Sequence, residues 1–169
     1  MKLWFYIGSG LVALWLQLTF ASTLSIGGMK PNLSLMLLLL VGFRWMDHWL
    51  FIFGALLGLT VDVFSHGMLG FYGITFFFAA VVARFAGQAM YENNVWISMG
   101  IVAGLSLIHG IFVVTLFEII DPEIPWWSWM FFKELPLALY HGVLTPLIFF
   151  PLVWLEKKYD LTESRRTLA

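Results

Sequence analysis

Apolar residues follow one another in this chain in long runs that contain no charge. Residues 35–41 read Leu-Met-Leu-Leu-Leu-Leu-Val, and residues 3–24 hold no charged side chain at all. A strand of a transmembrane barrel alternates apolar and polar residues, so continuous runs predict helices instead. Because backbone N–H and C=O groups in lipid need partners within the protein, a helical bundle is the architecture that remains.

Composition places this bundle in a bilayer. Hydrophobic residues make up 61% of the 169 residues and charged residues 11%, whereas soluble domains carry about 25% charged residues. A folded chain of this size still exposes about 30% of its surface, which so apolar a chain could not cover with polar groups. We therefore expect an all-α integral membrane protein with one domain, residues 1–157, and a short polar tail, residues 158–169.

Six apolar segments predict six transmembrane helices. Three of them are shorter than the roughly 20 residues that a perpendicular span needs. Either their polar flanks continue the helices, or the loops between them dip into the protein. The predicted spans are residues 3–24, 33–43, 49–64, 68–83, 95–117 and 131–155.

Lysine and arginine orient the bundle. With six spans, seven of the nine basic residues fall on the side that holds both termini, and an excess of basic residues marks the cytoplasmic side. Both termini are therefore expected in the cytoplasm, with Arg44 and Arg84 anchoring helix ends at the headgroups. The seven are Lys2, Arg44, Arg84, Lys157, Lys158, Arg165 and Arg166; Lys30 and Lys133 lie on the other side.

Two glycine pairs have the spacing that lets membrane helices approach closely. Gly54 and Gly58 lie in the third predicted span, and Gly100 and Gly104 in the fifth. Small residues four apart favour close packing in lipid. We expect both pairs to pack helices within the bundle; a face that binds a partner is the alternative.

The segment from Asp62 to Gly70 is the most distinctive. A carboxylate at membrane depth is costly, so Asp62 should face inward and be paired. It could pair with His66 four residues later, or accept backbone N–H groups from the turn at Gly67 and Gly70 or from the next helix. A ligand or proton site and a partner contact remain alternatives.

His109 and His141 form a second candidate pair. They lie at similar depth on adjacent antiparallel helices, about 12–14 Å from the outer boundary at 1.5 Å per residue. An inward-facing hydrogen-bonded pair, joined by Ser106, is the expected arrangement. A metal site would need three or four ligands, and the sequence offers no third ligand at a suitable spacing from the two histidines. A proton relay would need carboxylates that the neighbouring sequence lacks.

Acidic and aromatic residues gather near the predicted outer face. The loop at residues 119–130 holds Trp126, Trp127 and Trp129, a composition typical of a segment at the membrane interface. The acids form either a solvated rim or a docking patch for a periplasmic partner. They are Glu118, Asp121, Glu123 and Glu134.

The chain resembles the bacterial rod-shape-determining MreD family over nearly its whole length. The resemblance rests on Pro31-Asn32 before a leucine-rich helix, and on Gly54-x3-Gly58-Leu-x2-Asp62 followed by Gly67-x2-Gly70. Asn32 stands where many members have Asp, so a charge is not required there. The resemblance implies a six-helix bundle in the inner membrane, similar to the S components of energy-coupling-factor transporters.

What the resemblance implies is a non-enzymatic scaffold of lateral peptidoglycan synthesis. Its implied partners are a periplasmic MreC-type protein, and with it MreB, RodA and a class B penicillin-binding protein. Membrane lipids are also expected, whereas the net charge of −1 offers no nucleic-acid footprint. We expect no cofactor, since the sequence holds no nucleotide loop, no cysteine and no metalloprotease motif.

A rival hypothesis is the substrate-binding subunit of a small-molecule transporter. Tight capture of a small molecule usually needs several convergent polar groups. The candidates are Asn32, Asp62, His66, His109 and His141, which is few for a charged vitamin. An intramembrane enzyme is a third class, and no nucleophile stands at a convincing distance from a base.

Overall fold

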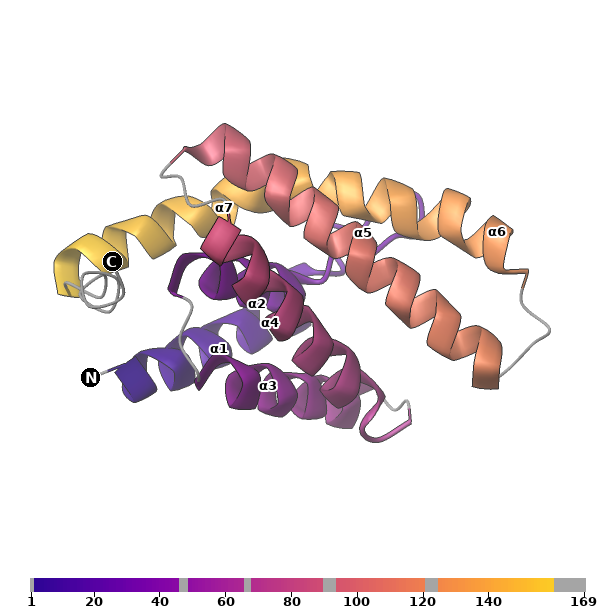
Figure 1. Ribbon diagram of the computed structural model, residues 1–169, viewed down its shortest axis with the longest axis horizontal. Coiled ribbons are helices and arrows are strands. Elements are labelled where there is room, and N and C mark those ends of the chain that lie inside the picture. Colours follow the sequence, from indigo (N-terminus) through magenta and orange to yellow (C-terminus); the bar gives the residue numbers. More distant parts are fainter. Residues whose placement is uncertain (1, 46–48, 66–67, 90–93, 121–124, 160–169) are drawn as a thin grey trace.

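Helices make up nearly all of the structure that the computed structural model describes, which covers residues 2–45, 49–65, 68–89, 94–120 and 125–159 (Figure 1). The expected all-helical fold class is thus confirmed over these residues. The helices are α1 (Lys2–Phe20), α2 (Leu33–Trp45), α3 (Trp49–Ser65), α4 (Phe71–Ala89), α5 (Val95–Ile120), α6 (Trp126–Trp129), a π-helical turn η1 (Met130–Glu134) and α7 (Leu135–Tyr159).

Helices α1 to α5 run in alternating directions, and α6, η1 and α7 form one continuous stretch that runs back from the end of α5. The start of α1 and the end of α7 lie at the same end of the molecule, here called the termini end (Figure 1). The ends of α1, α3 and α5 lie at the opposite end, called the far end. Two helical stretches, Val95–Ile120 and Trp126–Tyr159, are long and apolar enough to cross a membrane, and the other four apolar helices are shorter.

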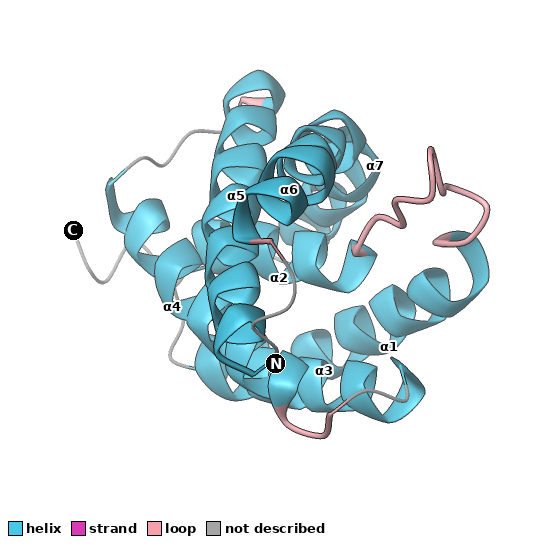
Figure 2. Cartoon of the chain, turned by 90° about the vertical axis from the view of Figure 1, so that its right-hand side faces the viewer, coloured by secondary structure: helices cyan, strands magenta, loops and turns pink. Residues whose placement is uncertain are grey.

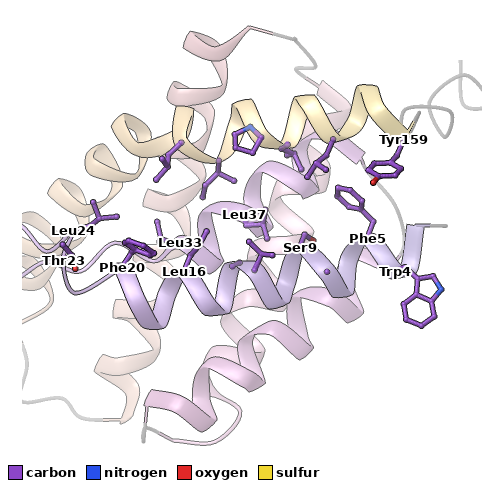
Figure 3. Close-up of a pocket in the computed structure, with 18 residues that line it drawn as sticks. Trp4, Phe5, Ser9, Leu16, Phe20, Thr23, Leu24, Leu33, Leu37 and Tyr159 are labelled. Carbon is purple, nitrogen blue, oxygen red and sulfur yellow. The ribbon is translucent and has the colours of Figure 1, made fainter.

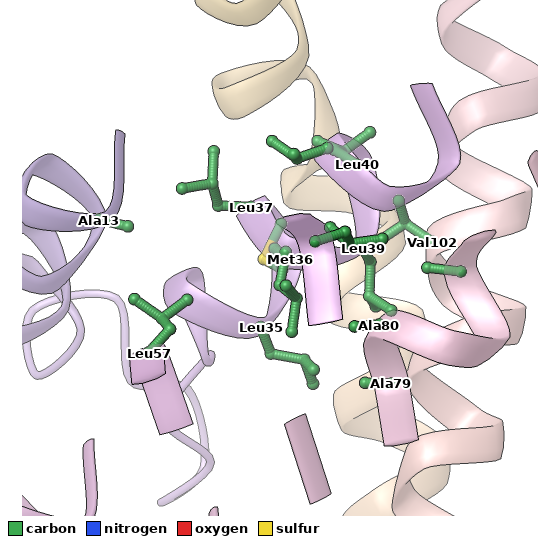
Figure 4. Packing of buried hydrophobic residues seen from close by; sticks show 14 of the residues in the cluster. Ala13, Leu35, Met36, Leu37, Leu39, Leu40, Leu57, Ala79, Ala80 and Val102 are labelled. Carbon is green, nitrogen blue, oxygen red and sulfur yellow. The ribbon is translucent and has the colours of Figure 1, made fainter. Parts of the chain in front are cut away.

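Helix α2 forms the centre of the molecule. All 13 of its residues are buried, and it packs against α1, α3, α4, α5 and α7. In Figure 4, Leu37 lies on the side of α2 that faces Ala13 of α1, and Leu39 on the side that faces Val102 of α5. A helix that is apolar on all sides lies in a protein core or in lipid; here five neighbouring helices enclose it.

The connection between α1 and α2 is not helical. It carries a tight turn in which Gly27 and Gly28 have φ of +59° and +81°, and Ile26 and Met29 pair across it. Two successive positive φ angles are what a type I′ turn requires, and glycine adopts them without strain. Figure 2 shows this segment as the long loop beside α1 and α7. Pro31, at the end of this connection, is buried.

The two glycine pairs behave differently. A Cβ atom on Gly58 would lie 2.1 Å from the backbone oxygen of Tyr72, and one on Gly54 would lie 2.9 Å from that of Phe76. These glycines therefore let α3 and α4 approach closely, as expected. For Gly100 and Gly104 the expectation was wrong: nothing in the described structure lies within 4 Å of a Cβ at either position, because both face outward from α5.

Of the described residues in the predicted outer loop, residues 119–130, all except Pro125 are helical. Ile119 and Ile120 end α5, and Trp126 begins a helical stretch that passes through η1 into α7. The loop prediction was therefore wrong for these residues; Asp121 and Glu123 lie outside the described residues. The first turn is closed by the Trp129 N–H, which donates to the backbone oxygen of Pro125 at 3.2 Å. The Trp126 and Trp127 rings lie edge to face, with centroids 4.8 Å apart.

Candidate functional site

The start of α2 is held by side chains from three helices. The Asn32 side chain caps its own helix, since Oδ1 accepts the Leu35 N–H at 3.0 Å. Oε1 of Gln17 on α1 accepts the Leu33 N–H at 2.7 Å, and Nε2 of His141 on α7 accepts the Asn32 N–H at 2.9 Å. The first N–H groups of a helix have no partner within it. Inside an apolar bundle they must be paired, and these three side chains do so.

These contacts determine the state of His141. Because the backbone N–H of Asn32 can only donate, Nε2 of His141 must accept and carries no proton. Nδ1 then carries the proton of the neutral ring and donates to Oγ of Ser106, 2.6 Å away. The expected link between His141 and Ser106 is therefore present. His141 is 1% exposed, and its role is to join α2, α5 and α7.

His109 does not complete the expected pair. It is buried, and no described residue supplies a hydrogen bond to its Nε2. Its ring packs edge to face on Phe76, with centroids 5.9 Å apart. Nearby, the half-buried Glu134 lies against Gly110, where its Oε2 would be 2.8 Å from an added Cβ. Among the described residues, Oγ of the fully buried Ser34 and Nε1 of Trp129 likewise have no hydrogen-bond partner.

Asp62 locks the junction between α3 and α4. Its Oδ2 accepts the Gly70 N–H at 2.9 Å and the Gly73 N–H at 3.2 Å, while Oδ1 accepts the Tyr72 N–H at 2.9 Å. The side chain is 1% exposed. Gly70 has φ of +93°, a backbone conformation that favours glycine. Of the roles considered for Asp62, the structure shows acceptance of backbone N–H groups; His66 and Gly67 lie outside the described residues.

Sequence reasoning missed a buried ion pair at the termini end. Nε of Arg44 on α2 donates to Oε1 of Glu156 on α7 at 2.8 Å, and a second guanidinium nitrogen contacts Oε2. The Trp45 indole N–H also donates to Oε1, at 2.6 Å. Arg44 and Glu156 are 2% and 3% exposed, so the expectation that Arg44 anchors a helix end at the headgroups was wrong.

The remaining candidates lie at the far end and face outward. Glu118 is exposed at the end of α5, and Trp127 is 69% exposed. Trp126 packs on Trp127, and Trp127 stacks on Phe131. Beneath them Phe117 contacts Phe71 and Trp129, which ties α4, α5 and α6 together. The far end therefore presents an aromatic surface on a rigid support.

The polar side chains of the interior mainly form hydrogen bonds that hold helices together. Asn32, Asp62 and His141, three of the pocket candidates, all pair with backbone groups at helix starts. Among the described residues no three His, Asp or Glu side chains come together in a way that could hold a metal ion. No family model, no curated protein and no solved structure matches this chain.

Proposed function

We propose that this chain is a six-span protein of the bacterial inner membrane that acts as an MreD-like, non-enzymatic scaffold of the cell-elongation machinery. In this proposal both termini are cytoplasmic, and the far end faces the periplasm. An MreC-type protein binds the far end, and the bundle holds it beside the synthases of lateral peptidoglycan.

The apolar surface supports the membrane part of the proposal. Large hydrophobic side chains are exposed on α1, α3, α4, α5 and α7; Trp4, Trp96 and Phe132 are 78%, 74% and 80% exposed. Soluble monomers seldom expose apolar patches larger than a few hundred Å². Around the bundle these side chains would face lipid.

One observation supports the scaffold role. The residues on which the family resemblance rests hold the helices of the bundle together. Asn32 caps α2, Gly58 brings α3 against α4, and Asp62 with Gly70 closes the junction between those two helices. Asn and Asp are about equally good at capping a helix, which explains why either residue suits the position of Asn32. Because these motif residues stabilise the packing of the bundle, they favour a protein that presents a fixed surface to a partner.

The transporter alternative loses support from the same contacts. It needs convergent polar groups that are available to a ligand. Asn32, Asp62 and His141 accept backbone N–H groups instead. We therefore retain the scaffold as the proposed function.

A co-purification experiment tests this proposal. The tagged protein is extracted in a mild detergent, and the proteins that co-purify are identified by mass spectrometry. The expected result is recovery of an MreC-type protein together with a cell-wall synthase. Recovery of paired ATPases with a transmembrane coupling subunit would instead establish a transporter.

Matched variants assign the partner to the far end. The double variant Trp126→Ala/Trp127→Ala should lose most of the MreC-type protein while its thermal midpoint stays close to that of the parent. The control is Trp96→Ala, which removes an exposed tryptophan at the other end of α5. Equal loss in both variants would reject a partner site at the far end.

A further inference from the structure

A long apolar groove separates α1 from α7 (Figure 3). Helix α1 packs on α2 and α3, while α7 packs on α5 and α2, and the space left between them has a volume of about 950 Å³. Phe5 and Leu16 line one wall, Leu147 and Leu152 the other, and Leu37 of α2 lies between them. The groove is thus a furrow along the outside of the bundle, with the central helix as its floor.

The groove is nearly as long as a bilayer is thick. It follows α1 from Trp4 to Phe20 and continues to Leu24. At 1.5 Å per residue the helical part alone extends about 24 Å, compared with about 30 Å for the hydrocarbon core. An occupant would therefore lie parallel to the helices, across much of the membrane.

The two ends of the groove differ in charge. At the termini end it reaches Tyr159, whose ring centre lies 5.6 Å from Nζ of the exposed Lys158. Lys157, also exposed in the last turn of α7, lies on the side of the helix that faces away from the groove. The Nζ atom of Lys158 lies 4.8 Å from the centre of the Trp154 ring. Glu156, their acidic neighbour, is paired with Arg44, so positive charge prevails among the described residues there. Thr23 and Leu24, at the other end, carry no charge.

We propose that this groove binds an anionic phospholipid, with its acyl chains along the wall between α1 and α7 and its phosphate at Lys158. Basic side chains beside a gap between membrane helices are suited to an anionic headgroup. Tyr159 lies at the level where amphipathic aromatic rings meet headgroups. The inference rests only on the membrane location in the proposed function and is independent of the scaffold role.

The uneven lining favours lipid over a partner helix. Small residues such as Gly8 and Ala13 lie among large ones such as Phe5 and Phe20, whereas a helix is a stiff rod about 10–12 Å wide. Acyl chains are thinner and adapt to an uneven wall. The charge at one end only also matches a molecule with a single anionic group.

The experiment is native mass spectrometry of the full chain in detergent, with palmitoyl-oleoyl phosphatidylglycerol as probe. Phosphatidylcholine with the same acyl chains is the neutral comparison. We expect retained phosphatidylglycerol adducts and few of phosphatidylcholine. The variant Lys157→Gln/Lys158→Gln should lower the preference for phosphatidylglycerol by roughly tenfold, whereas Lys133→Gln, on the exposed surface of η1, should leave it unchanged.

A second variant tests the groove itself. Gly8 lines it, and nothing lies within 4 Å of a Cβ at that position. Gly8→Phe should therefore fill the groove without disturbing α1 and should reduce retention of phosphatidylglycerol. Gly100→Phe is the matched control, since Gly100 is equally open and lies on α5, outside the groove.

Equal retention of both lipids by the parent protein would overturn the proposal, and so would unchanged retention by Gly8→Phe. A dimer or a protein complex that Gly8→Phe disrupts while lipid adducts persist would assign the groove to a helix instead. Failure to recover an MreC-type protein would reject the scaffold role and leave these lipid measurements unaffected.

Discussion

Arg44 and Glu156 lie 112 residues apart in the chain and meet as a buried, two-pronged ion pair. The pair joins the central helix α2 to the last helix α7 at the termini end. Trp45 donates to the same carboxylate, and the Arg44 guanidinium lies 5.1 Å from the centre of the Phe149 ring. The contact therefore unites two helix ends that sequence distance alone would not bring together.

Breaking this pair on one side should be costly. Arg44→Gln or Glu156→Gln leaves the other charge buried, which should lower the free energy of unfolding by about 3–5 kcal/mol. The double variant Arg44→Leu/Glu156→Leu should be closer to the parent than either single variant. Thermal unfolding in detergent checks this, with Lys157→Gln as the exposed control. Single variants that match the control would mean that the pair adds nothing.

Replacing Asp62 should destabilise the protein more when more of its oxygen acceptors are removed. Asp62→Asn keeps one oxygen acceptor, whereas Asp62→Leu removes the acceptor of three N–H groups, each worth about 1–3 kcal/mol when buried and unpaired. We expect the thermal unfolding midpoint to be highest for the parent, lower for the Asn variant and lowest for the Leu variant. A cell-shape complementation assay should give the same order, and equal behaviour of the two variants would contradict the capping role.

The two glycine pairs offer an internal comparison. Gly58→Ala places a methyl group against the Tyr72 carbonyl and should destabilise by about 1–3 kcal/mol. Gly104→Ala meets open space and should stabilise by about 0.5–1 kcal/mol, because alanine favours a helix. Unfolding measured side by side checks the opposite signs. A loss of stability in Gly104→Ala would show that α5 packs there after all.

The two buried histidines should also differ. His141→Leu leaves the Asn32 N–H and the Ser106 hydroxyl without their partner, at a cost of about 2–3 kcal/mol. His109→Leu removes a buried nitrogen that has no described partner, so stability should hold or rise. Nitrogen NMR of the labelled rings provides a second measurement: His141 should carry its proton on Nδ1. A proton on Nε2 would be incompatible with the contact to Asn32.

The chain contains no cysteine, which allows topology to be tested with single introduced thiols. Ser128→Cys, at the exposed far end, should react with a membrane-impermeant maleimide in cells whose outer membrane is permeable to it. Lys158→Cys should react only after the inner membrane is opened. Labelling of both in intact cells, or the reverse pattern, would contradict the proposed orientation.

The sequence predicts which segments form helices better than it predicts which face of each helix points into the bundle. The helices could be predicted because each long apolar run forms one. Several of their ends were wrong: α1 ends at Phe20 and not at residue 24, and α4 continues to Ala89 and not residue 83. Asp62 was recognised as inward and paired because a carboxylate inside an apolar bundle has few other stable arrangements. Gly54–Gly58 and Gly100–Gly104 share one spacing, yet only the first pair faces another helix. Spacing identifies a face of a helix, and only the packed bundle shows which way that face points.

Contacts between distant segments were the harder part. Arg44 was expected at the headgroups because arginines at helix ends commonly lie there, and nothing near it in sequence indicates Glu156. Gln17 was missed as a partner of the Leu33 N–H, because that role depends on how deeply the connection before α2 enters the bundle. The leucine-rich helix, in contrast, was recognisable from its composition. Its complete burial was not, since α5 is also apolar throughout and only seven of its 26 residues are buried.

The placement of α2 also determines when the bundle is complete during synthesis. This helix emerges early, but two of its contacts, those of Arg44 and Asn32, are made with Glu156 and His141 of α7. A chain that stops before α7 therefore lacks these two contacts, which lie at opposite ends of α2. Prematurely terminated products would for this reason be less stable than the full-length chain.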